Sequence, residues 1–107
     1  MKEIITSTTD SIPGKRIVKI LGVARGNTVR ARHIGRDIAA ALKNVIGGEV
    51  KSYTELTIQA RDEAFNRMIN EAIKLGADAV INIRFTTSLI MQGASEMLAY
   101  GTAVKIK

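Results

Sequence analysis

Two segments near the start of the chain carry a pattern typical of strands. The segments from Lys2 to Thr8 and from Arg16 to Arg25 are rich in β-branched residues. Both faces of the second segment are apolar, with Ile17, Leu21 and Val23 on one face and Val18, Ile20 and Ala24 on the other. A strand of this kind needs cover on both sides. We therefore expect the chain's own helices on one face and a neighbouring subunit on the other.

The middle of the chain changes to a helical period and predicts two helices. Between Val29 and Ile46, apolar residues fall on one helical face, and Gly47-Gly48 would end the helix. A second helix should begin at the capping box Ser52–Glu55, carry an apolar stripe from Leu56 to Ile73, and end at Gly76.

The last third of the chain predicts a β-hairpin. One strand runs from Ala79 to about Met91, Gln92-Gly93 forms the turn, and Glu96 to Ile106 returns. Alternation places Ala79, Ile81, Ile83 and Phe85 on one face of the first strand, and Leu98, Tyr100, Val104 and Ile106 on one face of the second. The order β-β-α-α-β-β predicts an α+β fold, an antiparallel sheet with two helices packed on one face, in a single domain over residues 1–107.

Composition limits the core and the chemistry. The chain has 107 residues and 11.6 kDa, with 46% hydrophobic but only 4% aromatic residues. The core must be small and aliphatic, so self-association would supply further burial. The absence of cysteine excludes disulfides, thiolate metal sites and thiol nucleophiles. No apolar run reaches the length of a membrane span and no secretory signal follows Met1, so we expect a cytoplasmic protein.

A net charge of +6 is concentrated near the N-terminus. The segment from Ser11 to Arg36 holds seven cations and no acid, a pattern that favours contact with phosphates or other anions. The alternative is a solvated basic face, because the segment has no aromatic residue and no zinc-finger or RNP motif. Candidate anion-binding residues are Lys15, Arg16, Lys19, Arg25, Arg30 and Arg32.

No catalytic or metal-binding constellation stands out. Soft metals need clustered cysteine, histidine or thioether ligands, and the chain offers His33 and four methionines. His33 and Asp37 stand at i and i+4 of a predicted helix, but nothing marks a serine or threonine as their nucleophilic partner. We expect no catalytic residues, no bound metal and no cofactor. An enzyme acting at a subunit interface through Arg61, Asp37 or Tyr53 is the alternative.

Several short motifs together resemble the YbjQ-like family of small bacterial and archaeal proteins, often labelled as heavy-metal-binding. The resemblance rests on Ile34-Gly35-Arg36-Asp37, Val45-Ile46-Gly47-Gly48, Tyr53, Ala60-Arg61, Ala64, Gly76-Ala77-Asp78-Ala79-Val80 and Gly101-Thr102-Ala103-Val104. It implies a dodecin-subunit-like fold that assembles into a ring-forming homopentamer, and it implies no established activity. Candidate contacts at a subunit interface or with a ligand are Arg36, Asp37, Tyr53, Arg61, Tyr100 and Thr102.

The sequence thus favours a non-enzymatic homo-oligomer that binds a small ligand or a partner at its subunit interfaces. Binding of an anion or a nucleic acid through residues 11–36 is the alternative function. No membrane partner is expected.

Overall fold

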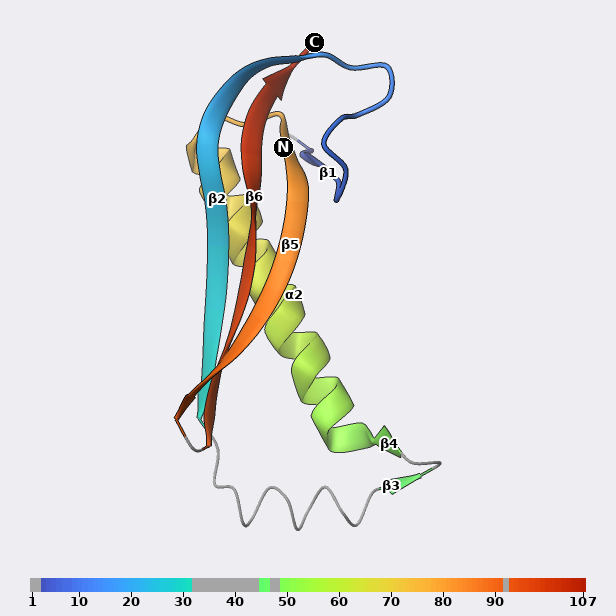
Figure 1. Cartoon of the computed structure of the whole chain (residues 1–107), viewed down its shortest axis with the longest axis vertical. Helices are drawn as coiled ribbons and strands as arrows, with labels where there is room; N and C mark the ends of the chain where they lie inside the picture. Colours follow the sequence, from blue (N-terminus) through green and yellow to red (C-terminus); the bar gives the residue numbers. More distant parts are fainter. Residues whose placement is uncertain (1–2, 32–44, 47–48, 92) are drawn as a thin grey trace.

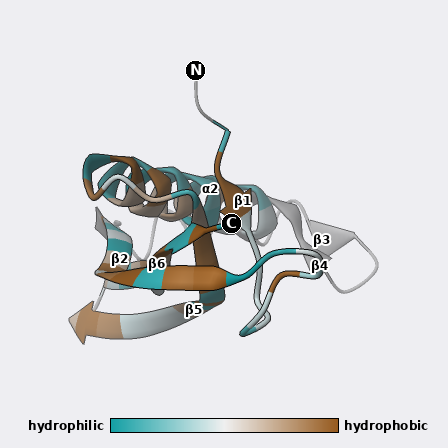
Figure 2. Ribbon diagram, turned by 90° about the horizontal axis from the view of Figure 1, so that it is seen from above, coloured by the Kyte–Doolittle hydropathy of each residue, from teal (hydrophilic) through white to brown (hydrophobic). Residues whose placement is uncertain are grey.

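The computed structural model of the chain describes residues 3–31, 45–46, 49–91 and 93–107. A four-stranded sheet has the order β1-β5-β6-β2, and one long helix, α2, lies on one of its faces (Figures 1 and 2). A short separate ladder pairs β3 with β4. The elements are β1 Ile5–Thr6, β2 Ile17–Ala31, β3 Val45–Ile46, β4 Glu49–Val50, α2 Lys51–Lys74, β5 Ala79–Met91 and β6 Ala94–Ile106.

The fold is α+β, but the predicted antiparallel sheet with two helices was wrong. The sheet is mixed, because β1 pairs in parallel with β5. The described residues contain one helix, and Val29–Ala31, expected in the first helix, extend β2 instead. Val45–Ile46 form β3, while residues 32–44 and Gly47-Gly48 lie outside the described part of the chain. This arrangement gives no support to the pentameric ring that the resemblance implied.

The second predicted helix is confirmed as α2, with a small change at its start. The helix begins at Lys51, so Ser52 lies inside it and is not its N-cap. Its end is as predicted: Gly76 has a φ of 81°, and its N–H donates to the Ile73 carbonyl at 2.9 Å. The buried face repeats every fourth residue, at Ala60, Ala64, Met68 and Ala72.

Small residues let α2 approach the sheet closely. A Cβ atom at Gly26 of β2 would collide with the backbone nitrogen of Met68 and the backbone oxygen of Ala64. The rest of this layer on β2 and β6 is also small, with Ala24, Ala99 and Ala103 fully buried. Thr28 adds a buried hydrogen bond from its hydroxyl to the Ala60 carbonyl at 3.3 Å. The backbones of α2 and β2 therefore lie in close contact at this point.

Irregularities in the strands divide the apolar residues between two faces. Asn82 has a φ of 53°, and the register of β5 on β6 shifts between Ile81 and Arg84. Ile83 therefore joins the core under α2, whereas Ala79 and Ile81 join a second cluster with Val104. The prediction that Ala79, Ile81, Ile83 and Phe85 share one face was wrong for this reason.

Two register shifts in β2 redistribute its side chains in the same way. The shifts lie between Ile17 and Lys19 and between Ile20 and Gly22. As a result Leu21 packs against the core under α2, while Ile17 packs against the second cluster, which Ile12 of the N-terminal segment also contacts. Ile20 pairs with Val104 and is 69% exposed. The two-sided character of this strand was predicted correctly, but the division of its residues was not.

We expect Gly26→Ala to destabilise the fold by about 3 kcal/mol, because backbone must move to admit the new methyl group. Urea denaturation measures this loss. Gly14→Ala is the control: its Cβ meets nothing within 4 Å, and only a φ of 77° opposes the substitution, at about 1 kcal/mol. Equal losses in the two variants would contradict the close approach of α2 to β2.

Candidate functional site

The face of the sheet that points away from α2 is largely uncovered. Cross-strand partners share a face, and the pairs Val23–Thr102, Arg25–Tyr100, Asn27–Leu98 and Val29–Glu96 join β2 to β6 there. On β5, Arg84, Thr86 and Ser88 continue these rows. We call this surface, with Ile20, the open face. Ile20, Val23 and Val29 are 69%, 65% and 55% exposed, which is unusual for β-branched residues in a long strand.

A polar network on the open face holds the edge strand β2, and Arg67 of α2 contacts the same strand from the helix side. The Asn27 side-chain amide donates to Glu96 at 3.0 Å, and the Ser88 hydroxyl approaches the other Glu96 oxygen at 3.5 Å. From α2, Arg67 donates to the Asn27 carbonyl at 2.6 Å and pairs with Glu63. One backbone carbonyl of β2 is therefore already satisfied by the chain itself.

The tip of the β5–β6 hairpin is apolar and exposed. Leu89, Ile90 and Met91 are 76%, 51% and 64% exposed. Figure 1 shows why: α2 and the strands separate toward this end, so the helix leaves the hairpin tip uncovered. The tip therefore adds three exposed apolar side chains at the hairpin end of the sheet.

A shallow groove of about 360 Å³ lies between α2 and β5, where the helix covers the sheet least. Phe65 and Phe85 line it with stacked rings whose centroids are 6.3 Å apart. Ile58, Arg61 and Asp62 complete the lining. The groove offers a flat aromatic wall beside one cation and one anion, a composition suited to a small amphipathic ligand.

The structure does not bring the predicted contact residues together. Tyr100 and Thr102 lie on the open face, but Arg61 lines the groove on the helix side of the sheet. Tyr53 belongs to the first turn of α2. Arg36 and Asp37 lie outside the described residues.

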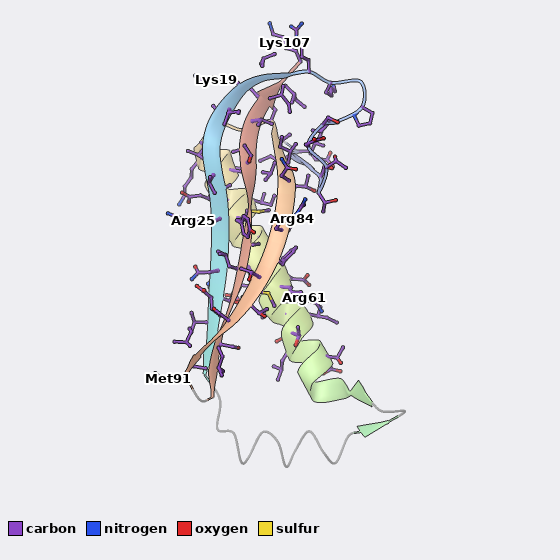
Figure 3. All side chains as sticks on the ribbon, viewed as in Figure 1. Lys19, Arg25, Arg61, Arg84, Met91 and Lys107 are labelled. Carbon is purple, nitrogen blue, oxygen red and sulfur yellow. The ribbon has the colours of Figure 1, made fainter. Side chains whose placement is uncertain are left out.

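The predicted basic segment does not form one patch either. Because β2 is extended, it spreads its cations along its length at about 3.3 Å per residue. Figure 3 shows Lys19 near one end of the molecule and Arg25 about halfway along it. Lys15 and Arg16 precede the strand, Arg30 is near its other end, and Arg32 lies outside the described part. Lys105 and Lys107 were not among the predicted residues: Lys105 of β6 pairs with Lys19, and Lys107, which follows β6, exchanges backbone hydrogen bonds with Arg16.

In the described part of the chain, α2 on one face of a mixed sheet defines a small two-layer α+β protein. The chain belongs to the YbjQ-like family, whose model matches residues 4–107 and is described as "Putative heavy-metal-binding". A UPF0145 protein of Archaeoglobus fulgidus is 61% identical over 106 residues, which cover 99% of this chain and 98% of the relative. A UPF0145 protein of Thermosipho africanus is 59% identical over 104 residues, covering 97% and 96%.

A solved structure shows the same fold. The crystal structure of a protein of unknown function from Pediococcus pentosaceus superimposes with a TM-score of 0.68, covering 97% of this chain and 98% of that one. Its sequence is 18% identical, so the likeness concerns the fold alone. Within the described part of this chain, no helix has the length and apolar character needed to cross a membrane.

The donor groups of this chain do not fit a heavy metal. The sequence has no cysteine and one histidine, His33, whereas soft metals prefer thiolate and imidazole ligands. The residues that the structure describes contain no group of three or more histidine, aspartate or glutamate side chains able to hold an ion. The described residues therefore provide no ligand set of the kind that the family's description implies.

We expect the purified protein to carry no stoichiometric zinc, copper, nickel or cadmium, because it lacks their preferred donors. Elemental analysis after gel filtration without chelator is the measurement. Metal near one ion per chain would contradict the expectation. If a His33→Ala variant retained that metal, oxygen or thioether ligands would be responsible.

Proposed function

We propose that the chain is a non-enzymatic subunit of a homo-oligomer, and that its open face docks against a second copy. The observation that carries the proposal is the exposure of Ile20, Val23 and Val29 on the face of the sheet that α2 does not cover. A small ligand binds in the groove lined by Phe65 and Phe85, on the helix side of the sheet.

The apolar side chains of the open face support a second copy as the occupant. Ile20, Val23 and Val29 are each more than half exposed, and Tyr100 is 38% exposed. Contact with another protein surface would remove this apolar area from water, which stabilises an assembly by about 25 cal/mol per Å².

The shape of the chain supports the same reading. The strands β2, β5 and β6 are 13 to 15 residues long and continue beyond the C-terminal end of α2 (Figure 1). An elongated sheet of this kind is stabilised when another molecule covers its apolar side chains.

The charges on the open face favour a copy of the same chain over a strongly acidic or basic partner. Arg25 and Arg84 lie in the row of Tyr100, and Glu96 lies two rows further along the open face. A surface that carries both signs can match itself when two copies meet. Tyr100, 38% exposed opposite Arg25, is the type of residue that dominates interface energetics.

Two adjacent substitutions separate assembly from folding. We expect Ile20→Asp to leave the fold intact and abolish self-association, because Ile20 is 69% exposed on the open face. Leu21→Asp should unfold the chain, because Leu21 packs against the core under α2 and a buried unpaired charge is costly. Size-exclusion chromatography with light scattering measures the mass, and circular dichroism measures folding.

Ile73→Asp is the matched control. Ile73 is 49% exposed but belongs to α2, so this variant should assemble like the unmodified protein. A folded, monodisperse monomer of the unmodified protein at micromolar concentration would contradict the proposal. Loss of folding in both Ile20→Asp and Leu21→Asp would contradict the assignment of the open face.

A further inference from the structure

The end of the sheet that carries the C-terminus gathers cations from separate parts of the chain. Lys19 of β2 and Lys105 of β6 are direct cross-strand partners. Arg16 and Lys107 exchange two backbone hydrogen bonds of 2.9 Å. Lys15 precedes Arg16 in a turn closed by its N–H on the Ile12 carbonyl at 3.0 Å. We call these five residues the terminal cation cluster; Figure 3 shows Lys19 and Lys107 at this end.

The terminal cation cluster is poorly neutralised. Asp78 lies 3.7 Å from the Lys105 ammonium. Among the residues that the structure describes, no ion pair involves Lys15, Arg16, Lys19 or Lys107, all of which are exposed. Like charges placed directly opposite in a sheet destabilise it. Such a local conflict between charge and fold is typical of a surface that meets an oppositely charged ligand.

We propose that the terminal cation cluster binds a chain of phosphate groups. Lysine ammonium groups are point charges on flexible stems and suit phosphate oxygens without fixed geometry. From Lys15 to Lys19 the backbone spans up to about 13 Å, and the neighbouring strand adds cations about 5 Å away. This spread fits several consecutive phosphates better than a single one.

The absence of aromatic side chains from the cluster defines what it recognises. Proteins that bind single-stranded nucleic acid stack bases on aromatic rings. The aromatic residues of this chain lie in other places: two in α2, one in β5, and Tyr100 opposite Arg25 in the middle of β2. Recognition therefore concerns the phosphates alone, whether they come from inorganic polyphosphate or from a nucleic-acid backbone. The inference does not depend on self-association, because the cluster lies at the end of the sheet and the open face does not include it.

Fluorescence anisotropy with two probes tests this inference. One probe is end-labelled inorganic polyphosphate, and the other is labelled single-stranded DNA with a matched number of phosphates. For Lys19→Gln/Lys107→Gln we expect about tenfold weaker binding at low salt. The slope of log K against log salt should fall by about 1.4 for DNA, since each lost contact on a single strand contributes about 0.7.

Asn66→Glu/Asn70→Glu is the control, because it changes the net charge by the same amount on exposed positions of α2. It should retain the slope and bind within about twofold of the unmodified protein. Equal weakening in control and test variants, or no binding of either probe at low salt, would overturn the inference.

The two probes identify the source of the phosphates. Binding of polyphosphate alone supports the site with polyphosphate as its ligand, and comparable binding of both probes supports it with any phosphate chain. Light scattering separates the two proposals: the Lys19→Gln/Lys107→Gln variant should lose phosphate binding at an unchanged assembly mass. Binding unchanged in a folded test variant would overturn the inference even if the protein self-associates.

Discussion

The contact between Gly26 of β2 and the backbone of α2 around Ala64 and Met68 determines how the rest of the structure is arranged. Only glycine allows this approach, and the neighbouring core positions on both layers are mostly alanine. A core of this kind is thin, because each alanine buries little apolar area. Met68, Val80 and Val104 are the largest side chains that are fully buried.

The thin core explains why so much apolar surface remains outside it. α2 packs mainly on β2 and β6, leaving β5 less covered, and it separates from the strands toward the hairpin tip (Figure 1). On the opposite face, the N-terminal segment covers Ala79, Ile81 and Val104 through Ile12, but it does not reach Val23 or Val29. The burial that this chain lacks internally is what the proposed second copy would provide.

The regular elements could be predicted from the sequence because their signals are local. The hairpin of β5 and β6 and the apolar stripe of α2 follow directly from residue spacing. The course of β2 could not be predicted, because pairing with β6 over its whole length overrides the helical pattern that was assigned to begin at Val29. The φ of 53° at Asn82 could not be predicted either, because the alternation of apolar and polar residues does not indicate a positive φ within a strand.

For the two candidate surfaces, the sequence predicted that they exist but not which residues form them. A two-sided apolar strand indicates an interface, but the register shifts in β2 decide which side chains face outward. The seven cations of the basic segment are visible in the sequence. However, the extended strand β2 places its cations far apart, and pairing with the end of the chain brings Lys105 and Lys107 beside only some residues of the segment. Pairing between distant segments, which no local pattern reveals, therefore determined both surfaces.

Hydroxyl-radical footprinting of the open face, read by mass spectrometry, tests the central claim most directly. Tyr100 and Met91 are 38% and 64% exposed in the single chain, whereas Met68 is fully buried. The account predicts that Tyr100 is protected in concentrated protein and becomes reactive on dilution, while Met68 stays protected throughout. Reactivity of Tyr100 that is high and independent of protein concentration would contradict the claim that a second copy covers the open face.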